Sequence, residues 1–372
     1  MTHAPDEHAA RRGESIFDPD AGEDSAPERL IYAQDRSTGL KAIISVHSTA
    51  LGPAYGGTRF YPYRDERAAV TDVLRLSRGM TYKAAAAGLN VGGGKAVIIG
   101  DPAEIKTPAL LEAYGELVES LGGTFITGGD VGTTSEDLDI IGRRTEHVGT
   151  RTPARGGSGD SGPLTAFGVF QAMRAAASHV WGASHLEGRC VGVEGLGKVG
   201  FHLARLLVDG GAHVLASDLS PAARDRVLAE LPDVRLVDDV SSHHDLDVYA
   251  PCALGATLST SSARSLRAEV VCGAANNQLV TPDVEDELVA RGITWVPDYV
   301  ASAGGLIQGV VEKDGGDELV ARQRVARVFE TVDSILSTAE RDRTTPGRAA
   351  QQLAQMRLDA ASRARLDTGT PS

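Results

Sequence analysis

A glycine-rich segment near the middle of the chain has the spacing of a dinucleotide-binding turn. Its residues are Gly195, Leu196, Gly197, Lys198, Val199 and Gly200, between the apolar runs 191–194 and 201–208. This order of strand, turn and helix is the setting that the GxGxxG fingerprint requires. The three glycines permit a tight turn, a close approach of pyrophosphate to the backbone, and close packing of helix on strand. The N-terminus of the helix offers N–H groups and a positive dipole to the anion. For Lys198 we favour a solvated side chain over a phosphate ligand.

An acidic residue stands where it can select the cofactor. Asp218 ends the next expected strand, 213–217, and follows Gly195 by 23 residues. An acid at this place binds the hydroxyls of the adenosine ribose and repels a 2′-phosphate. The sequence therefore predicts a site for NAD rather than NADP.

Lysine is scarce in this chain. Of 37 basic residues only six are lysines, at positions 41, 83, 95, 106, 198 and 313, which leaves 31 arginines. Lysine can lose its proton near neutral pH when it is buried, whereas arginine does not. A retained lysine is therefore a candidate for proton transfer, although a compositional bias of the genome produces the same ratio.

Several longer motifs occur in a fixed order. In the first half they are GPAYGGTR (52–59), GMTYK (79–83), GGGK (92–95) and DVGTT (130–134). In the second half they are APCALG (250–255), GAANNQL (273–279) and PDYV (297–300). Together they resemble the glutamate/leucine/phenylalanine/valine dehydrogenase family over about residues 29–365, and most closely its leucine and valine dehydrogenases.

The resemblance implies roles for three charged residues in the NAD-dependent, reversible oxidative deamination of a hydrophobic L-amino acid. Lys83 would bind the substrate carboxylate, Lys95 would be the catalytic lysine, and Asp130 the catalytic acid. The reaction passes through an iminium ion that water must attack, so it needs a base of near-neutral pKa. Burial among glycines, Lys83 and the nicotinamide cation are expected to lower the pKa of Lys95. Taken singly, Lys95 also fits a surface lysine after a glycine-rich turn, Lys83 a cation at a helix end, and Asp130 a loop acid or helix N-cap.

The same resemblance places the substrate site at two sets of residues. Gly56 and Gly57 lie in its glycine-rich motif. By this resemblance, the residues that contact the substrate side chain are Tyr55, Gly128, Leu306 and Gly309. The branched-chain enzymes of the family carry Leu, Ala, Val and Val at these four positions. One interpretation is a reshaped pocket for an aromatic or unusual amino acid. The other is that Tyr55 fills the space that the glycines leave.

Further contacts to the cofactor are implied at residues spread over the second half. They are Thr165, Cys252, Ala253, Ala274, Asn276 and Ser302. Relatives usually carry Asn in place of Ser302, and serine lacks the paired donor and acceptor of an amide. This departure supports an alternative function, a catalytically weak paralogue that binds NAD or an amino acid as a sensor.

The pattern of elements predicts a two-domain α/β protein with a deep cleft. Residues 1–28 read as a disordered tail. Residues 29–150 are expected to form a substrate and oligomerisation domain on which 340–372 packs back. Alternating strands and helices over 151–339 predict a parallel, doubly wound Rossmann domain, and glycine-rich 156–163 fits a hinge. We also expect a helix over 65–79 that stops at Gly79, turns at the glycines of 55–59 and 92–95, a capping box at 134–137, and one helix over 318–340.

Bulk properties exclude several classes of protein. A net charge of −13 argues against nucleic acid as a partner, and no apolar run is long enough for a membrane span. Cys190, Cys252 and Cys272 have neither disulfide nor zinc spacing, so no metal is expected. We expect a cytoplasmic enzyme whose partners are an amino acid and its 2-oxo acid, and a homo-oligomer of two or more subunits.

Overall fold

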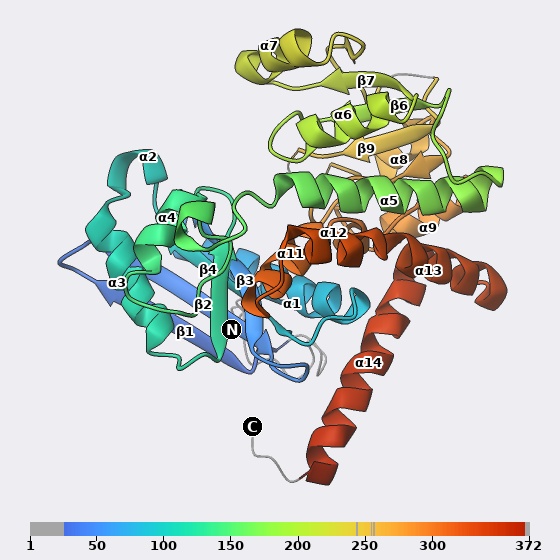
Figure 1. Ribbon diagram of the computed structural model, residues 1–372. Helices are drawn as coiled ribbons and strands as arrows, with labels where there is room; N and C mark the ends of the chain where they lie inside the picture. The colour runs from blue at the N-terminus through green and yellow to red at the C-terminus, as the bar shows by residue number, and fades with distance from the viewer. Residues whose placement is uncertain (1–25, 243–244, 254, 256, 369–372) are drawn as a thin grey trace, which may run out of the picture.

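The computed structural model describes residues 26–242, 245–253, 255 and 257–368. Two β-sheets with their helices divide this part of the chain (Figure 1). The first sheet has the order β1-β2-β4-β3-β5. Its strands are β1 (Arg29–Asp35), β2 (Leu40–Ser48), β3 (Ala54–Tyr61), β4 (Gly92–Ile99) and β5 (Phe125–Gly129). Its helices are α1 (Glu66–Ala86), α2 (Pro102–Ile105), α3 (Pro108–Glu119) and α4 (Ser135–Ile141).

Both faces of the first sheet are buried, because neighbouring residues of one strand pack on different helices. Ile44 and Ile98 belong to a core with Leu110 and Tyr114 of α3. Ile43 and Val97, one residue away, pack with Ala69 and Val73 of α1. β3 pairs in parallel with β4 and with β5, while β1, β2 and β4 pair antiparallel. The sheet is thus a mixed layer between α1 and α3.

The predicted stop of the first helix at Gly79 is wrong. α1 continues to Ala86, and its last turn therefore carries Lys83. The φ angle of Gly79 is not positive, and the alanine-rich run after it favours helix. The capping box at the start of α4 is confirmed, with Thr134 and Asp137 satisfying each other's backbone N–H groups.

The glycines expected in turns lie in strands instead. Gly56 and Gly57 are inside β3, and Gly92 to Gly94 are inside β4. They are glycine because other backbone is close. A Cβ on Gly56 would lie 1.8 Å from the carbonyl oxygen of Gly94, and a Cβ on Gly93 would lie 2.1 Å from the nitrogen of Thr81. Helix α1 thus rests directly on β4, which brings its last turn next to Lys95.

The second sheet is parallel at every pairing, with the order β11-β10-β9-β6-β7-β8. The chain winds out from β6 in both directions, so β6 and β9 form the switch point at which open α/β sheets bind ligands. Its strands are β6 (Cys190–Glu194), β7 (His213–Ser217), β8 (Arg235–Leu236), β9 (Val248–Pro251), β10 (Val270–Val271) and β11 (Thr294–Trp295). Its helices are α5 (Gly162–Trp181), α6 (Gly200–Asp209), α7 (Pro221–Glu230), α8 (Thr260–Ser265), α9 (Asp283–Ala290), α10 (Asp298–Ala301) and α11 (Gly304–Lys313).

The chain crosses between the sheets through the short 3-10 helix η2 (Pro153–Arg155) and returns at its C-terminal end. α12 (Glu318–Ala326) and α13 (Val328–Asp342) replace the single helix expected over 318–340. α14 (Pro346–Thr368) then packs against α1, where Ala354 joins Tyr82 and Ala85 (Figure 1). Residues 1–25 of the predicted tail lie outside the described residues, while Glu28 accepts hydrogen bonds from Thr49. The domain bounds 29–150 and 151–339 remain a proposal that this grouping of elements supports.

Candidate active site in the cleft between the two sheets

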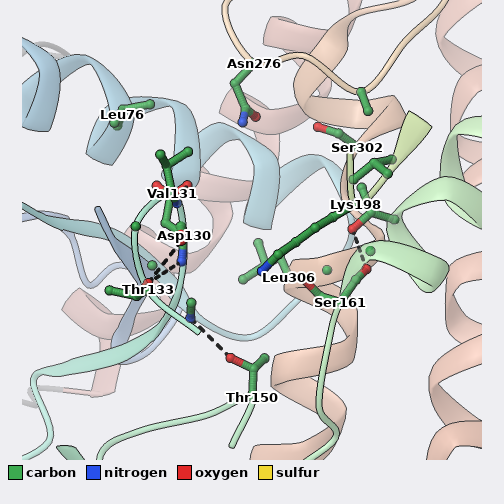
Figure 2. Close-up of a pocket in the computed structure, with 18 of the residues that line it drawn as sticks. Leu76, Asp130, Val131, Thr133, Thr150, Ser161, Lys198, Asn276, Ser302 and Leu306 are labelled. Carbon is green, nitrogen blue, oxygen red and sulfur yellow. Dashed lines mark hydrogen bonds between the residues drawn. The ribbon is translucent and has the colours of Figure 1, made fainter. Parts of the chain in front are cut away.

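A cleft of about 920 Å³ lies between the two sheets and collects predicted residues from both halves of the chain (Figure 2). From the first half it is lined by Lys83, Lys95, Asp130, Tyr55 and Gly57. From the second half it is lined by Thr165, Lys198, Val199, Cys252, Ala274, Asn276, Ser302 and Leu306. In Figure 2 Asp130, Val131 and Thr133 lie on one side of this space, and Ser161, Lys198 and Ser302 on the other.

Lys95 and Asp130 form a buried ion pair. Lys95 stands in β4 and Asp130 directly follows β5, and the Nζ–Oδ2 distance is 2.5 Å. The Nε atom of Arg59, on β3, lies 3.5 Å from the same oxygen. Burial alone raises the pKa of Asp130, but Lys95 and Arg59 outweigh it and hold the pKa at about 2. Asp130 is therefore a carboxylate at neutral pH.

The turn after β5 fixes the direction of this carboxylate. The N–H of Asp130 donates to Oγ1 of Thr133 over 2.8 Å, and the N–H of Val131 donates to Oδ1 of Asp130 over 2.7 Å. Thr133 in turn donates to the carbonyl of Thr58 in β3. The second carboxylate oxygen is left to face Lys95.

Lys83 reaches across the cleft to the second half of the chain. Its ammonium donates to Oδ1 of Asn276 over 3.2 Å, and to Oγ and the carbonyl of Ser302 over 3.0 and 3.4 Å. All three acceptors are neutral. Burial is the main cause that lowers the pKa of Lys83 to about 8, with Asp298 opposing the shift and Lys95 adding to it. A buried ammonium with neutral partners attracts a carboxylate.

Three predicted substrate residues lie behind the wall of the cleft instead of lining it. Gly56 faces the backbone of β4. Gly128 and Gly309 do not line the cleft, and the atom nearest to a Cβ on either would belong to Tyr55, which does line it. Their contribution to the site is thus the space that they leave for other groups.

The glycine-rich turn has the shape that a dinucleotide requires. Gly195 has a φ of +94°, which favours glycine. A Cβ on Gly200 would lie 1.8 Å from the carbonyl of Gly195, whereas a Cβ on Gly197 meets nothing within 4 Å. α6 has no side-chain cap, so its first N–H groups are available to an anion. The residues present therefore fit a pyrophosphate.

Asp218 stands beside this turn. Its carboxylate accepts hydrogen bonds from the N–H groups of Leu196 over 2.6 Å and Ser220 over 2.7 Å, which leaves further lone pairs on both oxygens. The side chain of Leu196 is fully buried, and Ala253 packs on Gly195. The cleft lining includes Lys198 and Val199 of the turn, but not the other predicted cofactor residues of this region, which are Gly195, Leu196, Gly197, Gly200, Asp218 and Ala253.

Two arginines in this region were missed by sequence reasoning. Arg59 is the last residue of the motif GPAYGGTR, but nothing in the sequence links it to Asp130. Its NH1 atom also contacts Asp72 at 2.8 Å. Arg226 donates to the carbonyl of Leu196 over 2.8 Å and stacks on Phe201 with its guanidinium carbon 4.0 Å from the ring centroid. Both arginines contact residues that are distant in sequence. No motif or residue spacing therefore predicts these contacts.

Over the described part of the chain, no group of three or more His, Cys, Asp and Glu side chains is arranged to hold a metal ion. A search of the same residues finds no helix with the length and apolar content needed to span a membrane. The three cysteines are unpaired thiols.

Comparison with known proteins decides the family. The model described as Glu/Leu/Phe/Val dehydrogenase, dimerisation domain, matches residues 27–157, and the model for glutamate/leucine/phenylalanine/valine dehydrogenase matches residues 222–365. A valine dehydrogenase of Streptomyces virginiae is 49% identical over 347 residues, which cover 92% of this chain and 96% of that protein. This chain belongs to the glutamate/leucine/phenylalanine/valine dehydrogenase family.

Other members support the same grouping. A leucine dehydrogenase of Bacillus subtilis is 44% identical and covers 91% of this chain and 93% of its own length. The crystal structure of the L-tryptophan dehydrogenase from Nostoc punctiforme superposes with a TM-score of 0.75 at 39% identity, covering 90% of this chain and 97% of that one. The chain is accordingly an amino-acid dehydrogenase with a Rossmann-type second domain, and the sensor alternative receives no support from these relatives.

Proposed function

We propose that this dehydrogenase converts a hydrophobic L-amino acid and water, with NAD, to the 2-oxo acid and ammonia, and that the reaction is reversible. The observation that carries the proposal is the meeting of Lys83 with the Lys95–Asp130 pair in one cleft. The glycine-rich turn, through Lys198 and Val199, borders the same cleft. The hydrophobic character of the substrate is supported by the buried wall of Tyr55 and Leu306.

In this proposal Lys83 holds and orients the substrate. Its ammonium is the buried cation whose present partners, at Asn276 and Ser302, are neutral. A substrate carboxylate supplies the missing negative charge, which fixes the position of Cα. Ser302 takes part by holding Lys83, so the replacement of the usual asparagine leaves a polar contact in place.

Lys95 and Asp130 manage the protons. After hydride has left Cα, the substrate is an iminium ion that a water molecule attacks at carbon. Lys95 first gives up the proton of the ammonium that pairs with Asp130 and then, as a neutral amine, accepts the proton of that water. Asp130 rests as a carboxylate, so it can protonate the leaving nitrogen only after a proton has passed to it across the 2.5 Å contact with Lys95. The carbon–nitrogen bond then breaks, Lys95 takes the remaining hydroxyl proton, and the 2-oxo acid and ammonia leave.

NAD, when bound, supplies the acceptor for the hydride. Residues of this chain suited to hold it are the N-terminus of α6 for the pyrophosphate and Asp218 for the adenosine ribose. The carboxylate of Asp218 disfavours a 2′-phosphate by charge repulsion. This supports NAD over NADP.

The test is a substrate panel in both directions. Purified protein is incubated with NAD or NADP and single L-amino acids, with D-enantiomers as controls, and NAD(P)H is followed by its near-ultraviolet absorbance. We expect NADH to form with at least one hydrophobic L-amino acid, and Asp218→Ser to narrow the preference for NAD. Absence of turnover with every amino acid, despite measured binding of NAD, would contradict the proposal.

We also propose that the enzyme is a cytoplasmic homo-oligomer. The match of residues 27–157 to a dimerisation domain supports the assembly. The three free thiols are compatible with a reducing compartment.

A further inference from the structure

An aromatic ring forms part of the wall of the cleft. Tyr55 lies on β3 with Gly93 of β4 and Ile126 of β5 as its neighbours across the sheet. Its side chain is only 4% exposed and borders the cleft together with Gly57 and Leu306. The sheet therefore fixes the position of the ring, and only the part of the ring that other residues do not cover borders the cleft.

Three glycines surround the far end of this ring, and their backbones do not require glycine. The φ angles of Gly128, Gly149 and Gly309 all lie outside the left-handed region. A Cβ on Gly309 would lie 2.3 Å from Oη of Tyr55, and a Cβ on Gly149 only 2.1 Å from it. A Cβ on Gly128 would make an ordinary contact, 3.5 Å from Cε1. Two of the three glycines are thus imposed by the tyrosine.

Gly309 lies inside helix α11, where glycine is unfavourable. Glycine within a helix costs about 1 kcal/mol relative to alanine. A reason for keeping it must come from packing, and the hydroxyl of Tyr55 is that reason. The space that Gly149 and Gly309 leave is consequently occupied and does not deepen the cleft.

The hydroxyl itself does not face the substrate. Oη is buried and has no hydrogen-bond partner among the described residues. The part of Tyr55 that borders the cleft is therefore ring carbon. A substrate side chain that reaches this wall meets a flat apolar surface and no polar group.

Resting on the proposed function, we propose that Tyr55 closes the side-chain end of the substrate site and selects short aliphatic L-amino acids over aromatic ones. Gly149 and Gly309 are the permissive partners that make room for the tyrosine. One ring thus occupies the space beside both glycines.

Steady-state kinetics with L-valine, L-leucine and L-phenylalanine test the proposal. The wild type is expected to prefer valine or leucine over phenylalanine by about tenfold or more in kcat/KM, and Tyr55→Leu to raise the phenylalanine-to-valine ratio by about tenfold. Tyr55→Phe should keep the wild-type ratio, because the hydroxyl is not in the cleft. Tyr61→Leu, on the same strand but 44% exposed, is the matched control and should change nothing.

A second comparison tests the packing without relying on turnover. Gly309→Val alone should lower the unfolding temperature, because its side chain overlaps Oη of Tyr55, and the double variant Tyr55→Leu/Gly309→Val should recover much of the loss. An active Tyr55→Leu variant with an unchanged ratio, or a wild type that prefers phenylalanine, would overturn the proposal. So would a Gly309→Val variant as stable as the wild type. A wild type inactive on all hydrophobic amino acids refutes the proposed function instead, and the stability comparison still decides the packing.

Discussion

Glycines determine the surroundings of Lys95. Gly94 precedes it in β4, and neighbouring glycines let β3 and helix α1 approach the strand at backbone distance. The result is a lysine that is only 7% exposed as a residue and whose Nζ lies 2.5 Å from the Asp130 carboxylate. The pairing of Lys95 with Asp130 and the place of Lys83 follow from motifs readable in the sequence. The part played by Arg59 does not, because its link to Asp130 exists only once β3 and β5 are paired.

Replacing Lys95 by alanine is expected to lower kcat by a factor of about 10² to 10⁴, the usual contribution of a positioned base. The affinity for NAD should stay near that of the wild type, because the glycine-rich turn belongs to the other sheet. Lys41→Ala, at a lysine on β2 with a 51% exposed side chain, is the matched control. Turnover by Lys95→Ala comparable to that of the wild type would remove the assigned base.

The charge of Lys83 predicts a pH dependence of substrate binding. Its pKa of about 8 means that the side chain is a charged ammonium below that pH and a neutral amine above it. Binding of the 2-oxo acid, measured in the absence of ammonia so that no turnover occurs, should therefore weaken as the pH rises through 8. Lys83→Gln should bind weakly at every pH. A wild-type affinity that is constant up to pH 9 or so would show that Lys83 does not hold the carboxylate.

Among the elements, the strands and helices with clear apolar periodicity were predictable, and those built around glycine were not. Glycine signals a turn when only local sequence is considered. In β3, β4 and α1 the glycines are required by close approach of other elements, which is a property of the assembled fold. For the same reason the packing of Gly149 on Tyr55 had no signal in the sequence.

Two carboxylates hold the segment that crosses between the sheets, Asp139 at Thr152 and Glu312 at Thr150 and Ser158. Glu312 of α11 accepts the N–H of Thr150 at 2.9 and 3.0 Å, the N–H of Ser158 at 2.8 Å, and the hydroxyl of Ser158. Thr150 has a φ of +58°, which is costly for a β-branched residue. Its Oγ1 accepts the N–H of Gly129, the neighbour of Asp130. Glu312 therefore stabilises a strained residue, Thr150, that contacts the strand end just before Asp130.

Glu312→Gln is expected to destabilise the protein, because it weakens the contacts that hold Thr150 in its strained conformation. An amide offers one acceptor where three donors converge, and its NH₂ group faces N–H groups, so we expect a loss of about 1–3 kcal/mol in the free energy of unfolding. Because the crossing segment supports Asp130, kcat should fall as well. Urea unfolding and kinetics measure both effects. The exposed loop residue Glu146, changed to Gln, is the control; equal stability of the two variants would contradict the role of Glu312.

At the scale of the whole molecule, the two sheets differ in kind and contribute different residues to the cleft. Lys83, Lys95 and Asp130 come from the mixed first sheet and its helix α1, and the glycine-rich turn lies at the switch point of the parallel second sheet. α14 ties the C-terminal end back to α1, the helix of Lys83. The alternation of elements predicted this division, whereas the contact of α14 with α1 was expected from length alone.

The first sheet also has an edge that predicts an assembly. Within the described residues β1 has β2 as its single neighbour, and Tyr32 on β1 is 57% exposed. An exposed edge strand with an aromatic side chain is a surface that proteins usually cover, and residues 27–157 match a dimerisation domain. Light scattering should give a mass that is a multiple of 38.9 kDa. Tyr32→Lys should lower that mass, whereas Leu228→Lys, at a 58% exposed residue of α7, should not. A wild type of monomer mass would contradict the assembly, and an unchanged mass in Tyr32→Lys would place the interface away from β1.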